Sequence, residues 1–299
     1  MDKQTLFLAV DGGATHCRAR IADAAGACLG SGHAGPANTR LGIEPVFAEI
    51  LSATGQALQA AGLDSRRIGD LHAGLGLAGL SLEADRRAVM AHRHPFLSLT
   101  AETDAYTACL GAHRGADGGI VTLGTGSNAC AIVEGTIIDL GGWGFRLGDQ
   151  GSAAQVGLAA LRRALLACEG MLPGSELCRS LLDRFDGEPE QAVLWAEAAR
   201  PSDYGALAQL VTEHATRGDT VAEALMREAG AEAALLIAAL YDRGVGRIAL
   251  VGGFARHIRP WLPEAVLAPL VEPQGDGLDG ALILARRALQ RMQAAADAG

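Results

Sequence analysis

The chain has 299 residues, of which 49% are hydrophobic and 20% are charged. This composition excludes a disordered chain, and the length fits one large domain or two ordinary domains with a substantial core. The net charge of -9, with no run of basic residues, argues against nucleic acid as a partner. No apolar run approaches the ~20 residues of a membrane span. A strand expected from residue 6 leaves no room for a signal peptide, so we expect a cytoplasmic protein.

Two residue types limit the chemistry. Lys3 is the one lysine in the chain, which excludes the P-loop lysine, the protein-kinase ion pair and a PLP Schiff base. The six cysteines show no C-x-x-C and no metal-ligand spacing, so we expect reduced, mostly buried thiols.

Strands and helices are expected to alternate in the first hundred residues. Strands are expected at 6–11, 16–22, 27–32, 70–77 and 96–102, and helices at 44–61, at 82–92 and from 105. The opening pattern then recurs. Strands are expected at 119–124, 128–133, 136–140 and 247–251, and helices near 153–168, 174–183, 189–199, 203–216, 219–243 and 277–297. This alternation indicates an α/β architecture with a partly parallel sheet.

Two glycine-rich hairpin loops, about a hundred residues apart, share one pattern. The first is Asp11-Gly12-Gly13-Ala14-Thr15 and the second is Gly124-Thr125-Gly126-Ser127, each between two apolar strands. Glycine lets backbone N–H groups turn toward an anion, and the hydroxyl groups add donors. The pair of loops therefore suggests two lobes that bind a polyphosphate between them.

Five motifs in order resemble the superfamily of sugar kinases, actin and heat-shock ATPases. Besides the two loops they are Gly142-Trp143-Gly144 with Gly148-Asp149-Gln150-Gly151-Ser152, Val251-Gly252-Gly253-Phe254-Ala255, and Asp279-Gly280-Ala281. The chain is most similar to N-acetylglucosamine and glucosamine kinases of the BadF/BadG/BcrA/BcrD ATPase branch. It departs from them at Ala14, Gln150 and Phe254.

The resemblance implies a fold and a domain division. We expect two ribonuclease H-like lobes, the actin-like ATPase fold, with the active site in the cleft between them. Residues 1–112 would form the N-terminal lobe and 113–285 the C-terminal lobe, with the final helix, 286–299, packed back on the first.

The resemblance also implies ATP and Mg²⁺ as cofactors. The residues expected to bind ATP are Gly12, Gly13, Thr15, Gly124, Thr125, Gly126, Gly252, Gly253 and Ala255. Turn hydroxyls are the alternative for Thr15 and Thr125, and a plain left-handed turn is the alternative for the glycine pair.

Two aspartates are the candidates for the chemistry of phosphoryl transfer, which depends on positioning and electrostatics. Asp11, at the end of the first strand, would hold Mg²⁺ through water; a turn-capping role is its alternative. Asp104, between a strand and a helix, would be the general base for a sugar hydroxyl; a helix N-cap would give the same local pattern.

The expected sugar contacts are Asn38, Asp104, Thr125, Gly142, Trp143 and Asp149, with core packing as the alternative for Trp143. The predicted reaction is ATP-dependent phosphorylation of the 6-hydroxyl of N-acetylglucosamine, with glucosamine kinase as the alternative and a BadF-type ATPase activator ranked lower. A sugar-sensing repressor and an actin-type ATPase switch are alternatives from other classes. We expect a small-molecule amino sugar as the partner and a homodimer.

Overall fold

The computed structural model describes residues 5–80 and 82–297, which divide into two compact units. The first unit contains the described residues up to Gly118 together with those from Glu272 onward. The second unit is Gly119–Val271. The chain therefore leaves the first unit after Gly118 and returns to it at Glu272.

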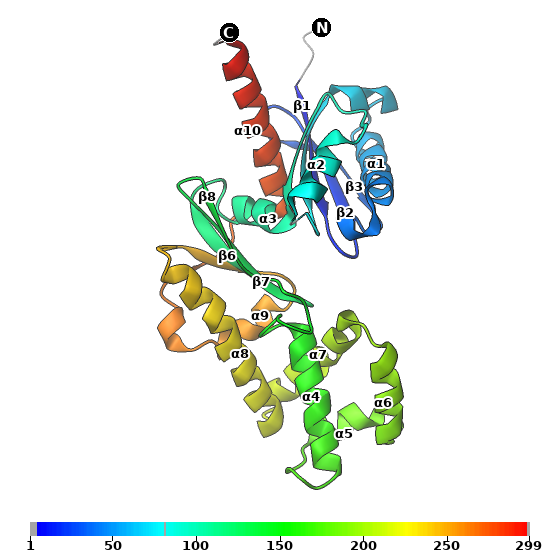
Figure 1. Ribbon diagram of the computed structural model, residues 1–299, viewed down its shortest axis with the longest axis vertical. Helices are drawn as coiled ribbons and strands as arrows, with labels where there is room; N and C mark the ends of the chain where they lie inside the picture. The colour runs from blue at the N-terminus through cyan, green and yellow to red at the C-terminus, as the bar shows by residue number, and fades with distance from the viewer. Residues whose placement is uncertain (1–4, 81, 298–299) are drawn as a thin grey trace. The chain divides into compact units, whose positions relative to one another are not determined.

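The first unit is a five-stranded mixed sheet with helices on both faces, and its strand order is β3-β2-β1-β4-β5 (Figure 1). Its strands are β1 (Leu6–Gly12), β2 (Cys17–Ala22), β3 (Cys28–Ala34), β4 (Leu71–Leu77) and β5 (Ser98–Thr103). Its helices are α1 (Ile43–Ala60), α2 (Glu83–Ala91), α3 (Asp104–Ala112) and α10 (Gly277–Asp297), with short 3-10 turns η1 (Thr39–Leu41) and η2 (Ser65–Asp70). β1 pairs antiparallel with β2 and parallel with β4, and β4 pairs parallel with β5.

Both faces of β1 are buried, which explains its unbroken apolar sequence. Leu6, Leu8 and Val10 pack in one cluster with the buried face of α1. Phe7 and Ala9 pack on the opposite face with the apolar residues of α10. In Figure 1 the C-terminal helix, drawn in red, accordingly runs beside the blue N-terminal strands.

Glycine brings two helices of this unit into backbone contact. A Cβ at Gly280 of α10 would collide with the carbonyl oxygen of Thr107 on α3. A Cβ at Gly111 of α3 would collide with the carbonyl oxygen of Asp276, just before α10. The two helices can pack at this distance because neither residue has a side chain.

The second unit has a five-stranded mixed sheet, in the order β10-β9-β6-β7-β8, and a group of helices. Its strands are β6 (Gly118–Leu123), β7 (Ser127–Val133), β8 (Thr136–Gly141), β9 (Ile248–Val251) and β10 (Leu270–Val271). Its helices are α4 (Ala153–Cys168), α5 (Glu176–Asp183), α6 (Pro189–Ala198), α7 (Pro201–Thr216), α8 (Thr220–Tyr241) and α9 (Ala255–Ile258), with 3-10 turns η3 (Arg259–Trp261) and η4 (Glu264–Val266). One hydrophobic cluster joins the sheet to α4, α7 and α8.

The α/β fold class and the mixed sheets predicted from the sequence are confirmed. Each predicted helix and strand is present, with ends that differ by a few residues at most. Besides the four 3-10 turns, one short strand and one short helix were not predicted. β10 has two residues and α9 has four, so neither is long enough to show a hydrophobic period.

The units observed here differ from the domain division expected from the sequence, which ended the first lobe at residue 112 and the second at 285. The second unit ends at Val271, because all of α10, including its first turn, packs on the first unit. Small residues such as Gly280 make that contact, and a hydrophobic pattern does not reveal them.

No helix within residues 5–80 and 82–297 is long and apolar enough to cross a membrane.

Cys17 lies buried beside the first glycine loop, and burial, with the charges of Asp11 and Glu49, raises the pKa of its thiol to about 12. The thiol therefore stays protonated and unreactive at neutral pH.

We predict that Gly280→Ala destabilises the first unit by roughly 1–3 kcal/mol, because the new methyl group meets the backbone of α3. Gly55→Ala is the matched control, since Gly55 lies on the exposed face of α1 with no atom near its Cβ position. That change should stabilise the protein by about 0.5–1 kcal/mol through helix propensity. Chemical unfolding of both variants measures the difference, and equal effects would contradict the close-contact account.

Candidate active site

The carboxyl ends of the parallel strands in the first unit bring Asp11 and Asp104 to one edge of the sheet. Asp11 on β1 is in register with Gly76 on β4, and Asp104 directly follows β5, whose last residue Thr103 is in register with Leu77. Two strand spacings separate the positions, a distance of about 10 Å across the sheet. Ligand sites of open α/β sheets lie at such carboxyl edges.

The loop that carries Asn38 is fastened to the same edge by backbone hydrogen bonds. The amide of Ala37 donates to the carbonyl of Gly13 (3.0 Å), and the amide of Thr39 donates to the carbonyl of Ala78 (3.0 Å). Asn38 Oδ1 accepts from the amide of Arg40 (3.0 Å), which leaves the side-chain NH₂ group as the donor for a ligand. The first unit thus brings Asn38, Asp11 and Asp104 together.

Asp104 is half-buried in the first turn of α3, but it does not cap that helix. Thr103 is the N-cap, because its hydroxyl accepts from the amide of Tyr106 (3.1 Å). Burial raises the pKa of the Asp104 carboxyl, and the charge of Asp11 acts in the same direction. Hydrogen bonds from the amide of Ala105 and from its own amide lower the pKa but do not outweigh burial. A carboxylate with a raised pKa is a better proton acceptor at neutral pH than an ordinary one.

Asp11 forms an ion pair that the sequence analysis missed. Arg18 Nη2 lies 2.5 Å and Arg18 Nε 3.2 Å from Asp11 Oδ2. In the β1–β2 hairpin, Arg18 is directly opposite Asp11. Aligning the two strands about the glycine loop in the sequence would therefore have predicted this pair.

The surroundings of Asp11 suit a metal ion that arrives with a polyphosphate. Among the described residues no group of three or more histidine, cysteine or acidic side chains could hold a metal by itself. Mg²⁺ is commonly held by one or two carboxylates together with substrate phosphates, and it keeps several waters. One partly exposed carboxylate beside a glycine loop fits that mode of binding.

In the second unit, Asp149 lies directly against the second glycine loop. Asp149 Oδ1 accepts from the amide of Ser127 (3.3 Å), and a Cβ at Gly126 would lie 2.9 Å from Asp149 Oδ2. Burial raises the pKa of this carboxyl, and its residue has a positive φ of 62°. The start of α4 holds the same loop, because the amide of Ala153 donates to the carbonyl of Gly124 (2.9 Å).

The Gly-Trp-Gly segment before Asp149 is exposed but tied down. Trp143 is 77% exposed, which rules out the core-packing alternative for its side chain. Gln155 on α4 donates through Nε2 to the carbonyls of Phe145 (2.7 Å) and Gly148 (2.8 Å). The segment from Gly142 to Asp149 is therefore held by a helix while the side chain of Trp143 faces solvent.

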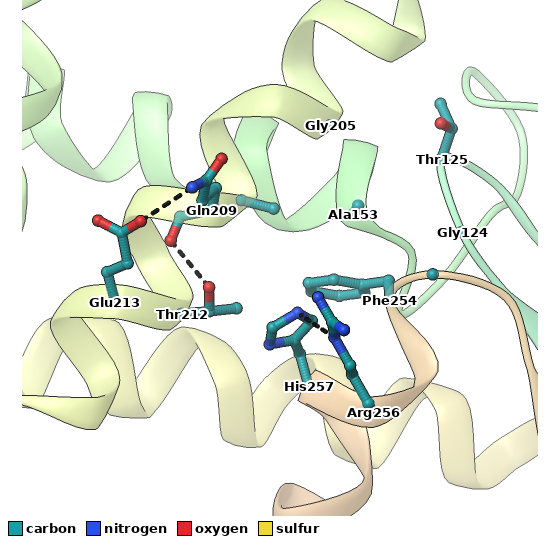
Figure 2. A pocket seen from close by; sticks show the side chains of 12 residues that line it. Gly124, Thr125, Ala153, Gly205, Gln209, Thr212, Glu213, Phe254, Arg256 and His257 are labelled. Carbon is teal, nitrogen blue, oxygen red and sulfur yellow. Dashed lines mark hydrogen bonds between the residues drawn. The ribbon is translucent and has the colours of Figure 1, made fainter.

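A cavity of about 590 Å³ lies within the second unit. Figure 2 shows side chains that line it. Its lining residues are Gly124, Thr125, Ala153, Gly205, Ala208, Gln209, Thr212, Glu213, Gly253, Phe254, Arg256 and His257. Polar side chains of α7 line one side, and residues of the Gly-Gly-Phe turn and α9 line the other. The volume lies in the range of ligand sites in proteins, about 300–1,000 Å³.

Three predicted nucleotide residues line this cavity, namely Gly124, Thr125 and Gly253. Gly252 and Ala255 do not. Gly252 makes the turn, with a φ of 96° and no room for a Cβ beside the carbonyl of Leu123, and Ala255 is buried at the start of α9. In the first unit, Thr15 is exposed in the turn between β1 and β2.

Sequence reasoning missed most of the polar lining of the cavity. Arg256 and His257, joined by a 3.1 Å hydrogen bond, follow the Gly252-Gly253 motif and could have been found from it. Gln209 and Glu213, also hydrogen-bonded (3.0 Å), lie on a helix with no recognisable motif. Lys3 lies outside the described residues, so the cationic side chains described are arginines and histidines.

Two units with mixed five-stranded sheets and glycine-rich loops define an α/β protein with the actin-like ATPase fold. The chain belongs to the BadF/BadG/BcrA/BcrD ATPase family, whose model matches residues 8–285. The resemblance to this family that the motifs indicated is therefore confirmed.

Two relatives with more than 30% identity and nearly full coverage are described as amino-sugar kinases. Glucosamine kinase GspK of Vibrio cholerae is 38% identical over 279 residues, which are 93% of this chain and 95% of that protein. The structure of a candidate N-acetylglucosamine kinase from Chromobacterium violaceum has 35% identity and a TM-score of 0.87, covering 94% of this chain and 99% of that one. A ROK family glucokinase from Streptomyces griseus, with 24% identity and a TM-score of 0.57, covers 94% and 99% and supports the fold.

We predict that Gly253→Leu abolishes binding of ADP, because the new side chain would project from the lining into the cavity. Nothing lies within 4 Å of a Cβ at Gly253, so the thermal stability should be unchanged. Gly252→Ala is the contrasting variant, which should lower the melting temperature because of its positive φ and the Leu123 carbonyl. Calorimetric titration and thermal unfolding separate the two effects; ADP binding by Gly253→Leu would contradict this assignment of the cavity.

We predict that Asp104→Asn raises the stability of the protein at pH 7. Since the folded pKa is raised, the native state holds this proton to higher pH than the unfolded chain, whose aspartates titrate near ~4. The wild type therefore loses stability as the pH rises through the raised pKa, and the asparagine variant does not. Between pH 4 and pH 8, the melting temperature of Asp104→Asn should exceed that of the wild type by an amount that grows with pH. A difference that stays constant over this range would contradict the raised pKa.

Proposed function

We propose that the protein is an ATP-dependent amino-sugar kinase that transfers the γ-phosphoryl group to the 6-hydroxyl of its sugar, releasing the 6-phosphate and ADP. The observation that carries this proposal is the half-buried Asp104, with a raised pKa, at the same sheet edge as Asp11 and Asn38. A hydroxyl group needs an acceptor for its proton, and the donor phosphates need a cation.

The cavity of the second unit supplies the nucleotide half of the proposal. Its lining combines a glycine loop with Phe254 and polar side chains, a mixture that suits a purine with its ribose. The second glycine loop opens onto the same cavity at Gly124 and Thr125. The amide of Gly124 donates to the carbonyl of Gly126 (2.9 Å), so the hydroxyl of Thr125 is the donor that would face the phosphates.

The sugar contacts follow from what each side chain can still bind. The NH₂ group of Asn38 can donate to a ring hydroxyl, and the carboxyl of Asp149 can accept from one. Trp143, being exposed, can cover an apolar face of a sugar ring. Mg²⁺, when bound with ATP, would neutralise charge on the phosphates, and Asp11 would hold it through water.

Of the two amino sugars, we place glucosamine first and N-acetylglucosamine second. This reverses the order expected from the sequence, because the curated relative with 38% identity and nearly complete coverage is a glucosamine kinase. The relative of similar identity described as a candidate N-acetylglucosamine kinase keeps the acetylated sugar in the proposal. The expected homodimer stays a prediction.

We predict that ADP release by the purified protein with Mg²⁺ and ATP rises at least tenfold with one of these amino sugars and little with glucose. Asp104→Asn should reduce that turnover by a factor of about 10²–10⁴, the usual contribution of a general base, while ADP and sugar still bind. A coupled assay measures turnover, and calorimetry measures binding.

The outcomes divide the alternatives. Basal ATP hydrolysis that no amino sugar stimulates would favour an ATPase switch and overturn the kinase proposal. Full turnover by Asp104→Asn with a stimulating sugar would leave the kinase in place but remove Asp104 from the role of base. Phosphorus NMR of the product distinguishes a 6-phosphate from a 1-phosphate.

A further inference from the structure

Two arginines on β2 form a short ladder of ion pairs with the start of α10. Arg18 Nη1 donates to Asp276 Oδ2 (2.9 Å), and Arg20 Nη1 donates to Asp279 Oδ1 (2.6 Å). The two arginines alternate along the strand, so their side chains lie on the same face of the sheet. Both pairs fasten the last helix to the hairpin of the first glycine loop.

Arg18 differs from Arg20 because it also binds Asp11. Its Nε and Nη2 atoms both donate to Asp11 Oδ2, at 3.2 and 2.5 Å, while Nη1 is held by Asp276. The guanidinium group is planar and rigid, so three nitrogens fixed on two carboxylates leave it little freedom. Burial would lower the pKa of Arg18, but the two aspartates outweigh this and raise it, so the group stays charged.

The backbone at the start of α10 lies over one face of the Asp11 carboxylate. A Cβ at Gly277 would lie 3.1 Å from Asp11 Cγ, 3.2 Å from Oδ1 and 3.3 Å from Oδ2, all closer than an ordinary contact. Asp276 itself is fixed, because its Oδ1 accepts from the amides of Leu278 (3.0 Å) and Asp279 (3.2 Å). The carboxylate of Asp11 is therefore held between a fixed guanidinium and a helix start.

We propose that Arg18 is a positioning residue that occupies Asp11 Oδ2 and so presents Asp11 Oδ1 to the hydrated Mg²⁺ of the nucleotide. This proposal rests on nucleotide binding in the proposed function, but not on the identity of the sugar. Ligating carboxylates commonly need such a second partner, and its loss costs about 10–100-fold in metal affinity or activity.

A merely electrostatic role for Arg18 makes the opposite prediction. Removing one positive charge beside Asp11 and Asp276 would leave two uncompensated carboxylates, which would attract Mg²⁺ more strongly. If Arg18 positions the carboxylate, its removal weakens the metal despite that gain. The sign of the change in Mg²⁺ affinity therefore distinguishes the two roles.

The test uses the full chain and compares Arg18→Gln, Arg18→Lys and Arg20→Gln. Calorimetric titration of ADP at a series of Mg²⁺ concentrations, with ADP in the absence of metal, gives the contribution of Mg²⁺ to binding. We expect both Arg18 variants to need about 10–100-fold more Mg²⁺, with metal-free ADP binding unchanged. Arg20→Gln should lower the melting temperature through the loss of its ion pair but keep the wild-type requirement for Mg²⁺.

Gly277→Ala is a second route to the same carboxylate, and it carries the test if Arg18→Gln does not fold. Its methyl group would press on the Asp11 carboxylate, at 3.1 to 3.3 Å from its carbon and both its oxygens, while the Arg18 side chain stays in place, so it should also raise the Mg²⁺ requirement. Arg18→Lys keeps the charge but has a single nitrogen, so restoration of wild-type Mg²⁺ dependence by lysine would overturn the proposal. Tighter or unchanged Mg²⁺ dependence in Arg18→Gln would overturn it as well.

The same experiments separate this proposal from the proposed function. If the Arg18 variants need more Mg²⁺ than the wild type to bind ADP, yet the wild type phosphorylates no amino sugar, the positioning role stands and the kinase proposal is rejected. A wild type whose ADP binding is indifferent to Mg²⁺ would reject the positioning role, whatever the sugar does.

Discussion

The backbone contact between α3 and α10 is the constraint on which the first unit depends. Gly111 and Gly280 let the two helices approach until backbone meets backbone, which no other pair of residues would permit. That contact fixes the start of α10 over β1 and β2. Asp276 then meets Arg18, and Arg18 meets Asp11. A packing requirement near the end of the chain thus determines how a carboxylate near its beginning is held.

The second unit positions its ligand groups in a related way, through hydrogen bonds rather than glycine contacts. Helix α4 begins beside the second glycine loop, and its Gln155 donates to the carbonyls of Phe145 and Gly148, which lie between Trp143 and Asp149. Glu232 of α8 accepts from the amide of Gly151 (2.7 Å), two residues after Asp149. These loops are therefore hydrogen-bonded to two long helices, which fixes the positions of the side chains that the loops carry.

The sequence was sufficient for the fold class and for most helices and strands, because apolar periodicity and glycine turns are local signals. It also indicated Asp104 and Asn38, which the structure brings near Asp11. It did not reveal Arg18, Asp276 or Gly277 as neighbours of Asp11, since two of these lie some 260 residues away in the chain. Nor did it reveal the polar face of α7, because side chains that line a cavity look the same in sequence as an ordinary solvated helix face.

The charges in the first unit have a consequence for how a nucleotide can approach. Asp11, Asp104 and Asp276 supply three carboxylates around this sheet edge, and Arg18 is the guanidinium bound to two of them. The pair of Arg20 and Asp279 adds no net charge. A polyphosphate would be repelled by this group unless a cation accompanied it. In the proposed reaction these charges would favour a nucleotide that carries a cation, and Arg18 would limit the repulsion while it holds Oδ2 of Asp11.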